Sequence, residues 1–316
     1  MRLYPIHMPV RFILFFALAC LISGCTLAKS LGIRIDNTIP VTDEMRRDAE
    51  AAGHLDEAMQ GYHNGQFLDP VSALSQLDQA IAINPDLADA QLYKGLAHAQ
   101  LDQWQEALGP LEAASRLRPH NVKAVYLLGF TQWKLGMTGE AEATMTRCIE
   151  LDGSHVDAYV QRGYMRAQSG EYQAAVDDYS QAIAMAPNRF DAYFNKGLAL
   201  FALKDYEQAA DDFTEAMALD PNSARAFAAR GECFLRLGQY ARARKDLSQA
   251  ARTDSSSRIM ELIAQAYAGE GDFSSAVETL NRAIAMTRAQ GDEQQSRRLT
   301  ELKDSLIRQV LKKTTP

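Results

Sequence analysis

Glycine recurs every 34 residues through the middle of the chain, and this fixed period limits the fold more than any other feature of the sequence. Five positions share the step: Gly95, Gly129, Gly163, Gly197 and Gly231. Self-similarity at a period of this length is typical of proteins that stack short units, each contacting only its neighbours. The sequence therefore predicts a linear array of repeats in place of one compact core.

Three further ladders keep the same step of 34 residues. Small apolar residues stand at Ala107, Ala141, Ala175, Ala209 and Ala243, and again at Ala80, Ala114, Cys148, Ala182, Ala216 and Ala250. Prolines stand at Pro85, Pro119, Pro187 and Pro221, and Gly153 holds the position between Pro119 and Pro187. Small side chains are needed where two helix backbones come closest, and proline ends a helix because it lacks an N–H. Each unit is therefore predicted to be a helix-turn-helix.

One unit shows which family the pattern resembles. It contains Ala192-Tyr193-Phe194-Asn195-Lys196-Gly197, then Tyr206-Glu207-Gln208-Ala209, then Phe213-Thr214-Glu215-Ala216 and Pro221. These residues are similar to the 34-residue signature of the tetratricopeptide repeat. The resemblance implies an all-α fold, a right-handed α-solenoid of about six to seven helix-turn-helix repeats with a C-terminal capping helix.

The repeats define the expected domains. A solenoid is predicted over residues 44–290, with repeats near 51–87, 88–121, 122–155, 156–189, 190–223, 224–256 and 257–290. The first repeat is degenerate and stretched by an insertion around Leu68-Asp69-Pro70. Within residues 291–316, an apolar stripe predicts an amphipathic helix that covers the exposed face of the last repeat, through Leu299, Leu302, Leu306 and Val310.

The N-terminus has the pattern of an export signal. Arg2 and Arg11 flank the start of an apolar run over residues 12–22, which is too short to span a bilayer and is typical of a signal peptide. The next residues, Ile22-Ser23-Gly24-Cys25, resemble the bacterial lipobox. That resemblance implies a signal peptide over 1–24, lipidation of Cys25 and a flexible tether over 25–43. The alternative is an ordinary small-residue cleavage site with Cys25 incidental.

Charged residues also repeat within the array. The residue before a ladder glycine and the residue 16 positions after that basic or neutral residue form three basic–acidic combinations: Arg162 with Asp178, Lys196 with Asp212, and Arg230 with Asp246. Neighbouring repeats hold neutral combinations at the same positions, except that Lys94 stands opposite Pro110. The hypothesis is an ion pair between the two helices of one repeat.

Composition excludes several classes of function. The formal net charge is −7 and no stripe of Lys and Arg is present, which argues against a nucleic-acid partner. The six histidines are scattered, and no nucleophile elbow, glycine-rich phosphate loop or metal-binding spacing appears. Cys148 and Cys233 are interpreted as small buried residues. We therefore expect no enzyme, no cofactor and no metal site.

The resemblance also implies where ligands bind. In tetratricopeptide proteins the first helix of each repeat lines a concave groove, with contacts from its second, fifth, sixth, ninth, twelfth and thirteenth positions. Carried over to the middle of this array, those positions give Lys123, Tyr126, Phe130, Trp133, Lys134, Val160, Tyr164, Gln168, Phe194, Asn195, Leu198 and Phe201. The alternative is that each aromatic ring packs between helices.

One known form of this groove is not expected here. The carboxylate clamp of chaperone-binding family members needs Lys at the fifth position and Asn at the ninth. This sequence departs from that pattern in four repeats, where those positions hold Leu92 and Leu96, Tyr126 and Phe130, Val160 and Tyr164, and Phe194 and Leu198. The departure argues against the clamp's mode of binding an acidic C-terminus.

These expectations combine into a non-catalytic scaffold. The layout is similar to that of NlpI-type lipoproteins, which implies a lipid-anchored adaptor in the bacterial cell envelope, on the periplasmic side of the outer membrane, that binds peptide segments of protein partners. One alternative is a pilotin-like assembly factor for a type IV pilus or secretion system. Another is a structural lipoprotein that associates with itself, for example as a homodimer.

Overall fold

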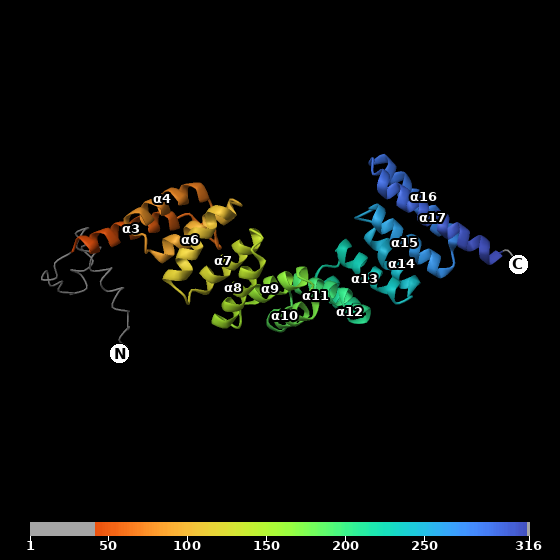
Figure 1. Ribbon diagram of the computed structural model, residues 1–316, viewed down its shortest axis with the longest axis horizontal. Helices are drawn as coiled ribbons and strands as arrows, with labels where there is room; N and C mark the ends of the chain where they lie inside the picture. Colours follow the sequence, from red (N-terminus) through yellow and green to blue (C-terminus); the bar gives the residue numbers. More distant parts are fainter. Residues whose placement is uncertain (1–41, 315–316) are drawn as a thin grey trace, which may run out of the picture. The chain divides into compact units, whose positions relative to one another are not determined.

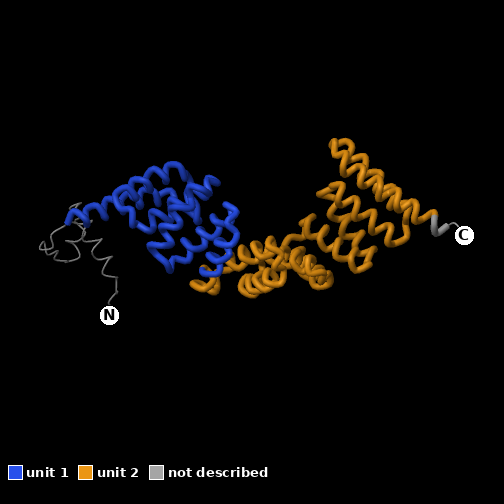
Figure 2. The backbone as a smooth tube through the Cα atoms, viewed as in Figure 1, with its two compact units in different colours: residues 1–147 blue, residues 148–316 orange. Residues whose placement is uncertain are grey.

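A computed structural model of the protein describes residues 42–314 (Figure 1). The predicted signal peptide, Cys25 and nearly all of the predicted tether lie outside the described residues. The described part divides between Arg147 and Cys148 into two compact units, coloured separately in Figure 2, and each is treated by itself. Among the described helices, none combines the length and apolar character that crossing a membrane would require.

The first unit begins with a helix pair that carries a small β-hairpin. Helix α3 (Asp43–Met59) starts at the cap residue Thr42, whose hydroxyl accepts a hydrogen bond from the Met45 N–H, and α4 (Pro70–Ile83) starts after Asp69. Between them, strands β1 (Tyr62–His63) and β2 (Gln66–Phe67) pair in antiparallel fashion. The predicted insertion site was wrong by a few residues, because the extra residues form this hairpin and Pro70 already begins α4.

The remaining helices follow in consecutive packed pairs (Figure 1). In the first unit they are α5 (Ala88–Gln100), α6 (Trp104–Leu117) and α7 (Val122–Lys134), with α8 (Thr138–Leu151) containing the division. In the second unit they are α9 (Val156–Gln168), α10 (Tyr172–Met185), α11 (Phe190–Ala202), α12 (Tyr206–Leu219), α13 (Ala224–Arg236), α14 (Tyr240–Ala250), α15 (Ser257–Glu270), α16 (Phe273–Ala289) and α17 (Glu293–Thr314). From α5 onward, the first helix of each pair begins at the residue where a repeat was expected to start. The all-α solenoid of helix pairs is confirmed.

The ladder glycines lie where the two helices of a pair come closest. A Cβ atom added at Gly197 would lie 2.8 Å from the ring of Phe213, and one added at Gly231 would lie 2.7 Å from Leu247. Both neighbours stand 16 residues after the glycine and are fully buried. The absence of a side chain at the glycine therefore lets the second helix of the pair place a large apolar residue against the backbone of the first.

The predicted ion pairs inside the repeats are confirmed. Arg162 and Asp178 are 2.6 Å apart, Lys196 and Asp212 are 3.2 Å apart, and Arg230 and Asp246 are 2.7 Å apart. All three carboxylates are buried, so each pair links two helices in the interior of a repeat. The exceptional residue Lys94 instead pairs at 2.7 Å with Asp78 of the preceding helix pair.

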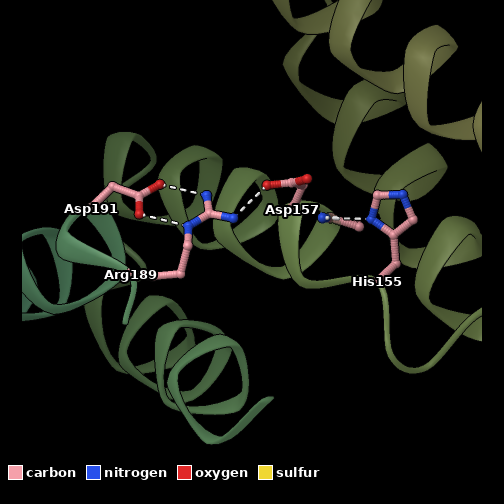
Figure 3. A network of polar contacts seen from close by, with 5 residues as sticks. His155, Asp157, Arg189 and Asp191 are labelled. Atoms are coloured by element: carbon pink, nitrogen blue, oxygen red, sulfur yellow. Dashed lines mark hydrogen bonds and ion pairs between the residues drawn. The ribbon is translucent and has the colours of Figure 1, made fainter. Parts of the chain in front are cut away.

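Neighbouring helix pairs are tied together by a second set of contacts. Arg189, just before α11, donates to Asp157 of α9 at 2.7 Å and to Asp191 at 2.7 and 2.9 Å (Figure 3). The Arg189 guanidinium holds the pKa of Asp191 below its ordinary value and its own pKa is raised, chiefly by the hydrogen bonds to Asp191. In the same view, His155 Nδ1 accepts the N–H of Ala158 at the start of α9.

The end of the solenoid is covered by the predicted capping helix. Leu299 of α17 is fully buried among Leu280, Ala283 and Ile284 of α16. Leu302 and Leu306 pack against the same cluster, one and two turns further along α17. The apolar stripe of α17 thus shields the last helix pair from water, as expected of the terminal element of an array.

Candidate functional site

The predicted groove residues fall in both compact units, so the two groups are described separately. The first group centres on the aromatic ring of Phe130, whose centroid lies 6.4 Å from that of Tyr126, 5.6 Å from Trp133 and 5.7 Å from Trp104. The Lys134 ammonium lies 4.9 Å from the centre of the Trp133 ring and 5.4 Å from that of Trp104. The four rings are half-buried and Lys134 is exposed.

Lys123 belongs to a different cluster in the same unit. Its ammonium donates a hydrogen bond to the Tyr62 hydroxyl at 2.6 Å and lies 4.9 Å from the ring centres of both Tyr62 and Tyr93. Tyr62 stands on β1 of the hairpin and Tyr93 on α5. Lys123 therefore fastens the hairpin to the helices, which is a structural role. Trp104, which the sequence did not single out, joins the Phe130 cluster instead.

The second group begins with three residues of α9 that the structure separates. Val160 is 5% exposed and lies in the core of the second unit, so its predicted place on the groove was wrong. Its branched side chain fills space between helices, where apolar burial is favourable. Tyr164 is half-buried and Gln168 is exposed.

Three of the predicted residues on α11 do come together around a cavity. Phe194, Leu198 and Phe201 line a hollow of about 330 Å³. Its other apolar lining comes from Phe213 of α12, Ala228 and Ala229 of α13, and Ile259 and Leu262 of α15. Leu198 is 45% exposed, so its side chain is accessible to a ligand at the cavity. The fourth predicted residue of α11, Asn195, is half-buried and is not among the lining residues.

A second cavity continues along the first helices of the same unit. It measures about 530 Å³ and is lined by α13, the start of α14, α15 and the start of α17, with Arg236, Glu261, Gln265, Gln295 and Arg298 among its residues. The two cavities share Glu232, Arg258 and Leu262. Together they form one surface, which we call the C-terminal groove.

The residues of this groove obey the positional rule used for the sequence. Arg225, Ala228, Ala229, Glu232, Leu235 and Arg236 occupy the second, fifth, sixth, ninth, twelfth and thirteenth positions of the helix that begins at Ala224. Arg258, Glu261, Leu262 and Gln265 occupy the second, fifth, sixth and ninth positions of the helix that begins at Ser257. The same positions therefore line the groove in these two repeats, to which the rule had not been applied.

Arginines and carboxylates alternate along the rim of the C-terminal groove. Glu232 accepts from Arg258 at 3.1 Å and lies 3.8 Å from Arg236. Glu261, which is buried, pairs with Arg298 of α17. Arg225 lies over the stacked rings of Phe190 and Phe194, at 4.6 and 4.8 Å from their centres. The groove thus combines an apolar floor with cationic side chains at its edge.

The thiols of the described region are not part of the groove. Cys148 and Cys233 are both fully buried, as predicted. Burial raises the pKa of the Cys148 thiol to about 11 and that of Cys233 to about 12. Thiols held protonated in this way are poor nucleophiles. Within residues 42–314, no group of three His, Cys, Asp or Glu side chains is placed to hold a metal ion.

Comparisons with known proteins agree with the fold. The family model described as the cilia and flagella-associated protein 70 C-terminal domain matches residues 72–311. Among curated proteins, none matches the chain. Among solved structures, pilF of Pseudomonas aeruginosa is similar with a TM-score of 0.57 and 18% identity, over 68% of this chain and 97% of pilF.

Two further structures are similar. A tetratricopeptide repeat protein of Parabacteroides merdae ATCC 43184 has a TM-score of 0.55 and 17% identity, over 80% of this chain and 98% of that protein. YrrB, described as a TPR protein with an unusual peptide-binding site, has a TM-score of 0.52 and 21% identity, over 60% of this chain and 99% of YrrB. At these identities the likeness is one of fold.

Proposed function

Because the chain belongs to the tetratricopeptide-repeat family represented by the cilia and flagella-associated protein 70 C-terminal domain, we propose that it is an adaptor for other proteins. The fold of this family is one of protein–protein interaction, and the proposed adaptor binds peptide segments of its partners in the C-terminal groove. The observation that carries the proposal is the cavity beside Leu198, where an exposed leucine and the half-buried rings of Phe194 and Phe201 meet. A concave apolar surface with a polar edge is the usual form of a ligand site. YrrB, which has the same fold, is described as binding peptide.

The adaptor is further proposed to act in the bacterial cell envelope, anchored by lipid. This part rests on the sequence Ile22-Ser23-Gly24-Cys25, which resembles a lipobox, and on the apolar run before it. Several acyl chains on one N-terminus give stable attachment, whereas a single chain does not. Residues between Cys25 and the first helix at Asp43 would then link the lipid to the solenoid on the periplasmic side of the outer membrane.

Site-specific photo-cross-linking tests the adaptor proposal. A photoreactive phenylalanine derivative is introduced at Leu198, which lines the groove, and the cells are irradiated. The matched control carries the same group at Leu219, an exposed leucine on the second helix of the same pair. We expect cross-links to other proteins from position 198 and few from position 219. Equal yields from both positions, or none from position 198, would contradict the proposal.

The identity of the cross-linked protein separates the adaptor from its alternatives. Envelope hydrolases or proteases are expected for the adaptor, and a secretin for a pilotin-like assembly factor. A second copy of this chain would show that the groove serves self-association. Light scattering after size-exclusion chromatography checks that last case, because a homodimer doubles the mass.

Replacing the lipidated residue tests the anchor by itself. The variant Cys25→Ser should move from the membrane fraction to the soluble fraction after cell lysis, because serine cannot form the thioether to the diacylglycerol. Incorporation of radiolabelled palmitate into the protein should be lost at the same time. A variant that stays with the membrane would contradict the lipid anchor and leave the adaptor proposal standing.

A further inference from the structure

We infer that the C-terminal groove selects acidic peptide segments: one apolar side chain enters the cavity beside Leu198, and nearby carboxylates of the peptide pair with Arg258 and Arg236. The inference rests on the proposed peptide-binding function and adds the chemistry of the partner. It follows from the shape of the cavity, the arginines at its edge and their shared carboxylate.

The apolar half of the site is a hollow that small residues keep open. Ala228 and Ala229 of α13 face Phe194, Leu198 and Phe201 of α11 across a volume of about 330 Å³. The position that holds Phe194 in α11 holds Ala228 in α13, one repeat later. The space beside these alanines suits a leucine or phenylalanine of a partner, because burying an apolar side chain is favourable.

The cationic half of the site has more positive charge than its own carboxylates balance. Arg258 is 76% exposed, and its partner Glu232 is shared with Arg236. One carboxylate thus serves two guanidinium groups, each of which could bind a carboxylate in bidentate fashion. Both arginines therefore retain hydrogen-bond donors for a ligand.

The charge of the whole lining agrees with this inference. Four arginines, Arg225, Arg236, Arg258 and Arg298, stand against three carboxylates, Asp254, Glu232 and Glu261. The groove is therefore net positive on a chain whose formal net charge is −7. A local positive surface on an acidic protein favours acidic segments and repels basic ones.

The same residues distinguish this site from a site for a polyanion. Glu232 and the buried Glu261 lie within the groove and would repel a continuous row of phosphates. The apolar floor also needs a hydrophobic side chain. A peptide that alternates apolar and acidic residues meets both conditions.

Selection from a peptide library tests the inference on the full chain. A phage library of random peptides of about twelve residues is panned against wild type. The most enriched peptide is synthesised with a fluorescein label, and its binding is measured by fluorescence anisotropy. We expect enriched peptides to combine Leu or Phe with Asp and Glu, and their affinity to fall as salt is raised from about 0.05 to 0.5 M.

Substitution of an arginine at the edge of the groove shows how much that side chain contributes to peptide affinity. Arg258→Ala should weaken binding of the acidic peptide about fivefold, as expected for one exposed charge pair. The matched control is Arg282→Ala, which removes a 67% exposed arginine that is paired with Glu278 on α16, outside the groove. This control should bind the peptide as wild type does.

A variant with tighter binding keeps the test independent of folding. Glu232→Gln removes the internal competitor of Arg258 and Arg236, so the acidic peptide should bind about two- to fivefold more tightly. Damage to the fold would weaken binding instead. Unchanged binding by Glu232→Gln, or weaker binding by a variant that unfolds at the same temperature as wild type, would overturn the inference.

The outcomes separate this inference from the proposed function. Enriched peptides that are basic or neutral, or whose affinity is unchanged by Arg258→Ala, would overturn the acidic specificity. The proposal that the groove binds peptides would still stand. A library that yields no peptide bound by the chain would overturn both the inference and the proposed function.

Discussion

Substitution of the ladder glycine Gly95 by alanine should destabilise the first compact unit. A Cβ atom at this position would overlap Cγ of Leu111 and would lie 2.7 Å from its Cδ2 atom and 3.3 Å from the carbonyl oxygen of Ala107. Leu111 is fully buried, so it has no free space into which to turn. The added methyl group must push the two helices apart or force Leu111 out of its rotamer.

The expected size follows from two opposing effects. Alanine in place of glycine in a helix interior is favourable by about 0.5–1 kcal/mol. Overpacking of a dense core costs about 1–3 kcal/mol. Because the methyl group at position 95 meets a buried side chain and a backbone atom, the second effect prevails, and we expect a loss of about 1–2 kcal/mol in the free energy of unfolding.

Two other glycines in the same unit form a graded control series. Gly53, in the interior of α3, has no atom within 4 Å of an added Cβ, so Gly53→Ala should stabilise the unit by about 0.5–1 kcal/mol. At Gly129 the nearest atoms are Cε of Met145 and Cγ2 of Thr144, both at 3.2 Å. The end of a methionine side chain yields easily, so Gly129→Ala should change stability little.

Tryptophan fluorescence during urea unfolding provides the assay. The chain has two tryptophans, Trp104 and Trp133, and both lie in the first unit, so their emission follows that unit alone. The urea midpoints should rise in the order Gly95→Ala, Gly129→Ala, Gly53→Ala, with wild type near Gly129→Ala. With a urea dependence of about 2 kcal/mol per M, the extremes should differ by about 1 M. A midpoint for Gly95→Ala at or above that of Gly53→Ala would refute the close-approach argument.

Three charge variants, measured by thermal and urea unfolding, test the ion pairs. Arg189→Ala should lower the free energy of unfolding by about 0.5–1 kcal/mol near neutral pH and by less in acid. The pKa of Asp191 is lowered in the folded chain, so its contribution to stability is present above the ordinary pKa of an aspartate and disappears as pH falls. Desolvation raises the pKa of Asp212, so ionisation of this carboxyl disfavours the fold. The stability of Asp212→Asn relative to wild type should therefore increase as pH rises above about 4. A decrease in that relative stability with rising pH would contradict the reasoning. Arg230→Met should cost about 3 kcal/mol by leaving the buried Asp246 unpaired, and a cost under about 1 kcal/mol would show that water reaches that carboxylate.

The periodic features of the sequence predicted most of the fold. A period of 34 residues fixes equivalent positions, so the helix starts at Val156 and Phe190 and the contacts between residues 16 positions apart follow from one repeat geometry. The pair between Arg162 and Asp178 was predictable for the same reason. Non-periodic features lacked this support. The hairpin was missed although Asn64-Gly65, both with positive φ, is a common two-residue turn between paired strands.

The candidate site was predicted in part. The positional rule found Phe194, Leu198 and Phe201, because a helix repeats its face every three to four residues. The burial of Val160 could not be predicted from its position, since a half-exposed face and the core differ by a small rotation of the helix. The arginine rim was missed because the positional rule was applied only to the three repeats that begin at Val122, Val156 and Phe190, although Arg225 and Arg258 occupy the same second position as Lys123 in later repeats.

Hydroxyl-radical footprinting of the complex with the enriched peptide tests the central claim most directly. Leu198 lines the C-terminal groove, whereas Met185 and Leu219 are exposed on the second helices of their pairs in the same unit. If the peptide binds in the C-terminal groove, it should lower the oxidation rate of Leu198 and leave the oxidation rates of Met185 and Leu219 unchanged. Protection of Met185 or Leu219 with Leu198 still oxidised at its free rate would contradict it.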